Sequence, residues 1–413
     1  MNLFKISLAN LKEKKLNSFL SMLLLTLGIG MISLLLLLNK QMDEQFRRNI
    51  RGIDMVVGAK GSPLQLILSS IYQIDAPTGN IPLEDVNALK RNPFVKNIIP
   101  LSMGDNYRGF RIVGTNAQYA EHFQAKTALG TLFSQSMEVT IGSKVARTLG
   151  LNIGDTFASS HGLDANGEAH GEKKYKVIGI FEANGSVIDQ LILTSLSSVW
   201  DIHEHEEAGG IHAEGDTHQT ESPDNSEDPH LEKKEITSAL IQFRNPMGLI
   251  TLPRHINQNT SMQAALPSIE INRLFSMLGV GIETLRALAA IIIFIAGISV
   301  LISLYNSLKE RKYEMALLLS MGATRTKLFF MLLYEGFILA ILGYISGILL
   351  SRLGLWFFSR AAEQDFHYSL NQNTLLAEEI YLFAGAIVIG LIAAAIPSLG
   401  IYRLNISRTL AEE

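Results

Sequence analysis

The residues best suited to bind a metal ion gather in one segment of the sequence. HEHEEAGGIHAEGDTHQTESPDNSEDPH (203–230) interleaves acidic residues with five histidines, namely His203, His205, His212, His218 and His230. Neutral imidazole is a favoured ligand for zinc, copper and nickel, and carboxylates can complete such a site. In an extended chain His203 and His205 project to the same side, so the two rings could hold one ion. The segment is therefore a candidate metal site, with zinc as the expected ion and a sensing or collecting role.

The composition of this region also has a simpler explanation. Residues 201–235 are acidic, contain Pro and Gly, and hold little that could enter a hydrophobic core. Such a composition predicts an exposed, flexible loop. The loop can be a tolerated insertion with no role of its own, and the sequence leaves this interpretation open beside the metal site.

A Gly-rich stretch invites a phosphate-binding interpretation. GAKGSP (58–63) contains Lys60 but lacks the G-x-x-x-x-G-K-[ST] spacing of a nucleotide-binding loop. A tight turn is the better prediction. That spacing occurs nowhere in the 413 residues, and neither do the GxSxG and HExxH patterns of hydrolases. The chain is therefore not expected to be an enzyme.

Four apolar runs are long enough to cross a bilayer, whose hydrocarbon core of about 30 Å takes about 20 helical residues. They cover residues 18–38, 286–305, 328–350 and 380–402, and the helix of the second run is expected to begin at residue 278. With 47% hydrophobic and 18% charged residues, the chain is too polar to consist of spans alone. We expect an α-helical membrane protein with four transmembrane helices plus a large extracytoplasmic α/β domain inserted between the first and second helices.

Lys and Arg flank these runs unevenly. Residues 1–17 carry four lysines, residues 306–327 carry five Lys or Arg, and residues 403–413 carry two Arg. Because cytoplasmic segments carry an excess of Lys and Arg, both termini and residues 306–327 are expected in the cytoplasm. Residues 39–277 are then external.

The external residues read as a mixed domain. PLEDVNALKRNP fits a short helix, whereas VKNIIPLSMG and FRIVGTN fit strands. The absence of cysteine excludes disulfides and thiolate metal sites. A net charge of −4 gives no basic footprint for a nucleic-acid partner.

A short amphipathic segment joins the second and third runs. In KERKYEMALLLSMGATRTK (309–327), charges dominate the first turn, apolar residues follow, and Gly322 is placed to stop a helix. A helix of this kind at the cytoplasmic face can enter the groove of a partner. It can equally be an ordinary interfacial helix between two spans.

Three residues in the third run concern helix packing. Gly343 and Gly347 form a small-xxx-small pair that favours close helix approach. Glu335 is costly inside an apolar run, which makes it a functional candidate. It lies only about two turns from the cytoplasmic end, where a bond to a neighbouring helix or to the interface explains it, and we favour that structural role.

Residues 310–347 resemble a known family. ERKYEMALLLSMGATRTKLFFMLLYEGFILAILGYISG is similar to the signature of the MacB/LolC/FtsX superfamily of type VII ABC transporter permeases. The matching positions are Glu314, Met315, Ala316, Leu317, Leu318, Met321, Gly322, Ala323, Glu335 and Gly336. The likeness extends to LFKISLANLKEKKLNSFLS, to VTIGSKVARTLGLNIGDTF and to the tail AAAIPSLGIYRLNISRTLAEE. The chain departs from the family at Leu319 and Tyr313, where Arg is usual or frequent, so its partner contact is expected to be more apolar.

The resemblance implies a permease that relays ATP-driven motion to an external domain, for export or extraction of an envelope substrate. A separate cytoplasmic ABC ATPase, which binds ATP and Mg, would dock on six residues of the coupling segment: Glu314, Met315, Leu317, Leu318, Gly322 and Ala323. Glu335, Gly336, Gly343 and Gly347 would serve intramembrane packing. A second copy of the chain or a related permease would pair with it, and a periplasmic adaptor or lipoprotein is a further expected partner. A metal-binding loop would link the transporter to metal homeostasis.

A different function is open within the same family. An FtsX-like signalling scaffold uses such a permease to activate an envelope hydrolase. Scaffolds of this kind usually carry a smaller external domain, so the size of residues 39–277 favours transport.

The expected boundaries follow from the runs and the resemblance. The transmembrane helices are expected at 18–38, 278–305, 328–350 and 380–402. The cytoplasmic parts are expected to be an amphipathic segment at 1–17, a coupling helix at 306–327 and a tail at 403–413. The external parts are expected to be a MacB-like periplasmic domain at 39–277, with the loop 201–235, and a short loop at 351–379.

Overall fold

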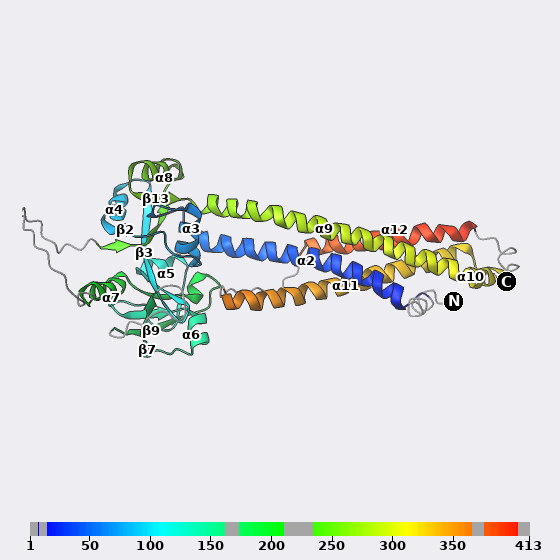
Figure 1. Ribbon diagram of the computed structural model, residues 1–413, viewed down its shortest axis with the longest axis horizontal. Helices are drawn as coiled ribbons and strands as arrows, with labels where there is room; N and C mark the ends of the chain where they lie inside the picture. Colours follow the sequence, from blue (N-terminus) through cyan, green and yellow to red (C-terminus); the bar gives the residue numbers. More distant parts are fainter. Residues whose placement is uncertain (1–6, 8–14, 162–172, 210–233, 366–375, 404–413) are drawn as a thin grey trace, which may run out of the picture. The chain divides into compact units, whose positions relative to one another are not determined.

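The computed structural model describes residues 7, 15–161, 173–209, 234–365 and 376–403 (Figure 1). The chain divides into two compact units. The first, called the membrane unit here, comprises Met1–Asp43 and Ser276–Glu413, and the second, called the external unit, comprises Glu44–Phe275. Each unit is described by itself.

The membrane unit is built from four long helices that lie alongside one another (Figure 1). They are α2 (Lys15–Ile50), α9 (Pro267–Glu310), α11 (Arg325–Asp365) and α12 (Glu378–Ser398), with the short α10 (Lys312–Ser320) and the 3-10 turn η4 (Leu399–Arg403) at their ends. All four long helices have the length and hydropathy to cross a membrane. The expected fold, four apolar helices with a mixed domain between the first and the second, is confirmed.

Helix α11 is longer than the sequence suggested. Residues 351–379 were expected to form a short external loop, yet α11 remains helical to Asp365. Its sequence after residue 350 contains no proline and is rich in good helix formers. One side of this extension also stays packed, because Leu355 and Ser359 are buried. The charged residues make the extension less hydrophobic as a whole. Its buried side nevertheless keeps it packed in the bundle.

The external unit contains one large mixed sheet. Its strands are β1 (Met55–Ala59), β3 (Val95–Tyr107), β4 (Phe110–Thr115), β5 (Thr127–Gly130), β6 (Glu138–Ile141), β7 (Thr156–Phe157), β8 (Ser160–His161), β9 (Tyr175–Phe181), β10 (Ile192–Ser195), β12 (Ser238–Phe243) and β13 (Met262–Ala265). Their order is β13-β1-β12-β3-β4-β10-β6-β9-β5, with β7 on β9 and β8 on β3. β2 (Ile81–Pro82) and β11 (Glu235–Ile236) form a separate pair. Among the strands that the structure describes, only β10 with β4 and β6 with β9 pair in parallel.

Short helices cover this sheet. They are α3 (Pro63–Ile67), η1 (Leu68–Tyr72), α4 (Leu83–Ala88), η2 (Leu89–Arg91), α5 (Ala117–His122), α6 (Ser143–Leu149), η3 (Val187–Gln190), α7 (Leu196–Gly209) and α8 (Met247–Asn259). One apolar cluster packs α8 on β1, β12 and β13 through residues such as Leu252 and Ile256. Another packs α6 on β6, β9 and β10 around Val145. A third cluster takes alternate residues of the same strands, such as Val56 and Leu193, and so packs Tyr72 and Tyr119 on the opposite face of the sheet.

The Gly-rich stretch 58–63 is a structural turn. It joins β1 to α3, and the Ser62 side chain accepts a hydrogen bond from the Gln65 amide as the N-cap of that helix. A Cβ on Gly58 would lie 2.4 Å from the Leu66 side chain and 3.2 Å from the Thr237 carbonyl. The glycine therefore allows close packing of α3 on the sheet.

Two long helices end inside the external unit. The last residues of α2 pack there through Phe46, whose ring centroid lies 4.6 Å from that of Tyr72 and 5.5 Å from that of Phe275 in the first part of α9. The Tyr72 hydroxyl also donates to the Phe46 carbonyl at 2.9 Å. Asn49 is fully buried, and its side-chain oxygen accepts from the Val187 amide at 3.1 Å. The ends of α2 and α9 are thus integral parts of the external unit.

His122 lies beside the turn that follows α2. Its Nδ1 lies 2.9 Å from Gln242 Nε2, which also donates to the Gly52 carbonyl at 2.9 Å. Burial lowers the pKa of His122 below its ordinary 6.5, and a hydrogen bond with the Arg51 backbone opposes this shift. The neutral ring is therefore the form that this site stabilises.

We expect the external unit to lose stability as the pH falls below about 6.5, the ordinary pKa of His122. A lowered folded-state pKa gives stability that is fully present above the unfolded pKa and is lost as the pH falls through the folded one. In a Trp356→Phe background, where Trp200 alone reports on this unit, His122→Asn should reduce the drop in thermal midpoint between pH values of about 7.5 and 5.5.

The matched control is His255→Asn, because His255 is exposed on α8. This change should leave the pH dependence as it is in the parent protein. An equal drop in midpoint for the parent and for His122→Asn would contradict the role given to His122.

Candidate coupling and helix-packing site

Helix α10 is set off from α9 by a single residue. Arg311 adopts φ −104° and ψ 19° between the two helices. Its amide still donates to the Ser307 carbonyl at 3.2 Å, and its Nε lies 2.9 Å from Glu314 Oε2. The chain therefore bends at Arg311 without losing the hydrogen bonds of a helix. The ion pair of Arg311 with Glu314 spans this bend.

Gly322 ends α10 in the way its position in the sequence suggests. It adopts φ +94°, a conformation that costs any residue with a Cβ. The Gly322 amide donates to Leu319 at 3.1 Å and the Ala323 amide to Leu318 at 2.9 Å. These two bonds form the Schellman motif, which satisfies carbonyls left over at the helix end. Thr324 then accepts from the Lys327 amide and starts α11.

The predicted docking residues differ in exposure. Glu314, Leu317 and Gly322 are exposed, and Leu318 and Ala323 are half-buried. Met315 is buried in a cluster with residues of α9, α11 and η4, so its side chain supports α10 from beneath and is not presented outward.

Two further residues belong to the outward face of α10. Tyr313 is 42% exposed and Met321 77%, and with Leu317 at 45% they recur at every fourth position. Residues with this spacing lie on one face of a helix. The four-residue spacing was visible in the sequence, where Tyr313 was noted only as a departure from a family arginine. The exposed stripe of α10 is defined here as Tyr313, Leu317 and Met321.

Helices α11 and α12 approach each other through small residues on both sides. A Cβ on Gly336 would lie 2.6 Å from Ala394 Cβ and 2.6 Å from the Gly390 carbonyl oxygen. A Cβ on Gly390 would lie 2.7 Å from Ala340 Cβ and 2.9 Å from the Gly336 carbonyl oxygen. Each helix thus presents a small-xxx-small pair to the other, and the contact has no room for a methyl group.

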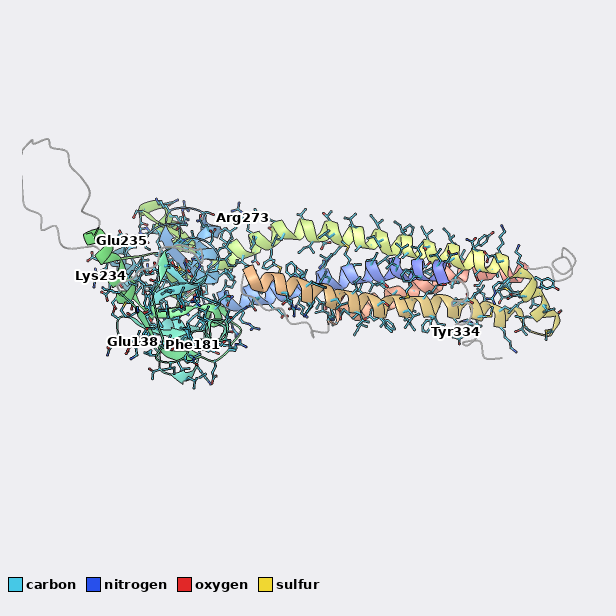
Figure 2. All side chains as sticks on the ribbon, turned by 60° about the horizontal axis from the view of Figure 1, so that its bottom comes forward. Glu138, Phe181, Lys234, Glu235, Arg273 and Tyr334 are labelled. Carbon is cyan, nitrogen blue, oxygen red and sulfur yellow. The ribbon has the colours of Figure 1, made fainter. Side chains whose placement is uncertain are left out.

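Glu335 faces inward at the start of this contact. It is 2% exposed, whereas Tyr334 next to it is 41% exposed and is labelled on α11 in Figure 2. A buried carboxylate in an apolar helix must be satisfied by neighbouring groups. Glu335 is therefore buried in the membrane unit, and its packing role stays a prediction.

The other side of α11 meets α2 in a regular parallel register. A Cβ on Gly343 would lie 2.8 Å from Leu25 Cβ, and one on Gly347 would lie 3.0 Å from Ile29 Cβ. One four-residue step further, Ser351 Oγ lies 2.9 Å from Ser33 Oγ. The two glycines noted in the sequence therefore belong to a longer ridge of small residues.

A buried polar cluster, which the sequence analysis did not identify, lies at the end of this ridge. Arg352 Nη2 lies 3.0 Å from Glu379 Oε2, with 18% and 5% of the two side chains exposed. Both residues were assigned to the loop 351–379, but the structure places them in α11 and α12. The only signal in the sequence was the pair of opposite charges directly outside two apolar runs.

The histidine segment lies largely outside the described residues. His212, His218 and His230 fall among residues that the structure does not describe. His203 and His205 lie in α7, and residues two apart in a helix are rotated by roughly 200°. The extended His-x-His geometry expected from the sequence is therefore absent there. Among the described residues, no three His, Cys, Asp or Glu are grouped to hold a metal ion.

A second histidine-bearing stretch was missed in the sequence. HGLDANGEAHGE (161–172) starts at the end of β8, where His161 pairs with Asp105 of β3. Lys173, the first described residue after this stretch, donates from Nζ to the Asp201 carbonyl at 2.6 Å. Asp201 lies two residues before His203. The described residues that flank the two stretches are thus neighbours, and the stretches hold seven of the ten histidines.

Two family models match successive parts of the sequence. Residues 18–221 match the family model described as the MacB-like periplasmic core domain. Residues 286–406 match the family model described as the C-terminal part of FtsX-like permeases.

Individual relatives are distant. The chain is 23% identical over 344 residues to the pyoverdine export ATP-binding/permease protein PvdT of Pseudomonas putida, which covers 79% of this chain and 48% of that protein. The chain therefore spans about half the length of this curated relative.

Two solved structures match about half of this chain. The periplasmic region of MacB from Actinobacillus actinomycetemcomitans is 13% identical and covers 55% of this chain and 95% of its own, with a TM-score of 0.32. The extracellular domain of the noncanonic ABC-type transporter YknZ from Gram-positive bacteria is 14% identical and covers 51% and 98%, with a TM-score of 0.29.

We expect Gly336→Ala to destabilise the membrane unit, because the added methyl group would meet Ala394 and a carbonyl oxygen of α12. Overpacking of this kind costs about 1–3 kcal/mol. The thermal midpoint of the detergent-purified chain, followed by the fluorescence of Trp356 in a Trp200→Phe background, should fall.

Gly385→Ala in α12 is the matched control, since a Cβ there meets nothing within 4 Å. The better helix propensity of alanine, about 1 kcal/mol, should leave that variant as stable as the parent or slightly more stable. Equal behaviour of the two variants would contradict the packing assigned to Gly336.

Proposed function

Because this chain belongs to the FtsX-like permeases that carry a MacB-like periplasmic core domain, we propose that it is the permease of an ABC transporter whose external domain is moved by ATP hydrolysis in a partner chain. The substrate class that we propose is an envelope molecule that is exported or extracted. The similarity to a Pseudomonas protein named for pyoverdine export favours transport over activation of an envelope hydrolase.

The exposed stripe of α10 is the observation that carries this proposal. The nine-residue helix α10 presents Tyr313 and Leu317 outward, its C-cap residue Met321 extends this stripe, and Met315 and Ala316 are buried on the other side. A short apolar stripe on a helix whose other side is packed can insert into a groove of a partner. The ion pair of Arg311 with Glu314 and the Schellman motif at Gly322 hold this helix at both ends.

Helix α2 supports the relay of motion to the external domain. It is one continuous helix, and its residues up to Asp43 belong to the membrane unit while those from Glu44 belong to the external unit. The external part is held by Phe46 and Asn49. A displacement of α2 within the membrane unit would therefore move residues that are built into the core of the external unit.

The orientation and the partners are part of the proposal. The excess of Lys and Arg in residues 1–17, 306–327 and 403–413 supports a cytoplasmic place for both termini and for α10. The partner that docks on α10 would be a cytoplasmic ABC ATPase, since no nucleotide-binding spacing occurs in the 413 residues. A second permease chain and a periplasmic adaptor or lipoprotein would complete the assembly in the bacterial inner membrane.

One variant tests the orientation and the docking surface together, because the chain has no cysteine of its own. Leu317→Cys should react with a membrane-impermeant maleimide in inside-out vesicles and stay unlabelled in right-side-out vesicles. The bulky adduct should then abolish co-purification of the ATPase and lower ATP hydrolysis by about tenfold or more, since it fills the apolar stripe.

Ile250→Cys is the control on the opposite side, because Ile250 is 71% exposed in the external unit. It should show the reverse labelling pattern, and its adduct should leave ATPase co-purification unchanged. Labelling of Leu317→Cys from the outside would refute the orientation. Labelled protein that keeps its ATPase would refute docking on α10.

We also propose that the histidine-bearing stretches bind zinc and adjust transport to external metal. The support is the proximity of the described residues that flank them, Lys173 with Asp201 and Asp105 opposite His161. Because α7 is helical at His203 and His205, these two residues would need further ligands from the two stretches to surround one ion. The affinity would be modest, since a chain segment loses conformational entropy when it is fixed around an ion.

Calorimetry on the full chain in detergent tests this second proposal. Near neutral pH, where histidine is largely neutral, zinc should bind with measurable heat. A variant with Ser at positions 203, 205, 212, 218 and 230 should lose most of that heat, whereas His255→Ser should keep it. An absence of zinc-binding heat in the parent chain would leave the stretches as insertions without a metal role.

A further inference from the structure

The C-terminal part of α11 carries an exposed face of large side chains. Leu353 and Phe357 are 56% and 66% exposed, whereas the opposite side of this stretch, which includes Leu355, is buried. Residues three and four apart share one face of a helix, so the half-buried Trp356 and the exposed Arg360 belong to the same side. The 353–360 face is defined here as Leu353, Trp356, Phe357 and Arg360.

The charge on this face is held by an aromatic ring. Arg360 Cζ lies 4.0 Å from the centroid of the Trp356 ring. Among the described residues, Arg360 forms no ion pair with a carboxylate. An indole has no hydrogen-bond acceptor, so stacking on it attracts the guanidinium through the π face only. The N–H donors of Arg360 therefore remain able to bind an anion.

The contacts between α11 and α12 indicate the level of this face along the helix. At one end of α12 the rings of Phe329 and Tyr402 lie 6.0 Å apart, and at the other end Arg352 pairs with Glu379. The stretch of α11 between these two contacts is about 34 Å long. It thus matches the hydrocarbon core of a bilayer, which is about 30 Å thick. In a membrane, the 353–360 face would therefore begin at the layer of lipid headgroups.

A phospholipid has the chemistry that this face can bind. Tryptophan is enriched where the bilayer meets water, and a guanidinium binds phosphate through charge-assisted hydrogen bonds. A long Arg side chain can also lean toward the phosphate layer while its stem stays on apolar surface. The exposed residues Leu349, Leu353 and Phe357 recur at every fourth position and offer an apolar track for an acyl chain. A lipid with net negative charge fits best, because a cation without a carboxylate partner attracts it.

We propose that the 353–360 face of α11 is a binding site for an anionic phospholipid. The phosphate binds Arg360, and one acyl chain runs along Leu349, Leu353 and Phe357. The bound lipid holds α11, the helix against which α2 and α12 both pack, at one depth in the bilayer. The lipid is a ligand of the permease and not its transported substrate, so the inference goes beyond the proposed function and needs no ATPase.

Fluorescence quenching in vesicles tests this site in the full chain. In a Trp200→Phe background, Trp356 is the only tryptophan. The vesicles contain equal amounts of phosphatidylcholine and phosphatidylglycerol, and only one of the two carries bromine on its acyl chains. Quenching of Trp356 by the two brominated lipids should give about a fivefold preference for phosphatidylglycerol. This factor corresponds to about 1 kcal/mol, the usual attraction of one Arg to an anionic membrane surface.

Two variants separate the site from the general attraction of charge. Arg360→Gln should abolish the preference, so that both brominated lipids quench Trp356 equally. Arg254→Gln is the matched control, because it removes the same charge from an exposed position on α8, and it should keep the preference. Both side chains are exposed, so both variants should melt at the midpoint of the parent. A preference that survives in Arg360→Gln would overturn the role of this residue.

Three other outcomes would overturn the site itself. Equal quenching by the two lipids in the parent would mean that α11 contacts bulk lipid only. Weak quenching by both would mean that protein, such as a second chain, covers the face. Inorganic phosphate, added to the chain in an uncharged detergent, should leave the emission of Trp356 unchanged. A response to it would assign the site to a free anion, and none of these results bears on docking of the ATPase at α10.

Discussion

The close approach of α11 to two neighbours at once is the constraint on which the membrane unit depends. Inside a bilayer the apolar side chains of a helix gain little by leaving lipid for another helix, so association relies on dense contact and on polar bonds. The reciprocal contacts of Gly336 and Gly390 bring the two backbones within reach of each other's carbonyl oxygens. On its other side, α11 uses Gly343 and Gly347 in the same way against α2. A single helix thus holds both partners because small residues occur on two of its faces.

This arrangement has consequences at both ends of the bundle. At one end, the packed start of α11 contributes Leu328, Met331 and Leu332 to the base on which α10 rests, and this base leaves the apolar stripe of α10 free to meet a partner. At the other end, the ridge of small residues ends at Ser351 and brings Arg352 and Glu379 together with Ser33. The same helix therefore links the surface proposed to receive the ATPase with the buried polar cluster of Ser33, Arg352 and Glu379.

The external unit includes the ends of two long helices in its own packing. Phe46 and Asn49 of α2 and Phe275 of α9 pack against the core of this unit. Tight packing transmits displacement because interiors have few voids to absorb it. In the function proposed above, this packing would pass a displacement of the two helix ends on to the sheet.

The sequence by itself determined the four spans, the mixed external domain and the stop of α10 at Gly322. These features depend on local properties, namely apolar length, alternation and the positive φ that glycine tolerates. Gly343 and Gly347 could likewise be recognised as packing residues from their spacing.

The tertiary structure alone decided that Met315 turns inward while Tyr313 and Met321 turn outward. It alone placed Arg352 and Glu379 in helices and beside Ser33, and set a helix where His203 and His205 were expected to be extended. The physical reason is that these features arise from contacts between residues far apart in the chain, and neither the partner nor the register of such a contact is encoded in the spacing of one segment.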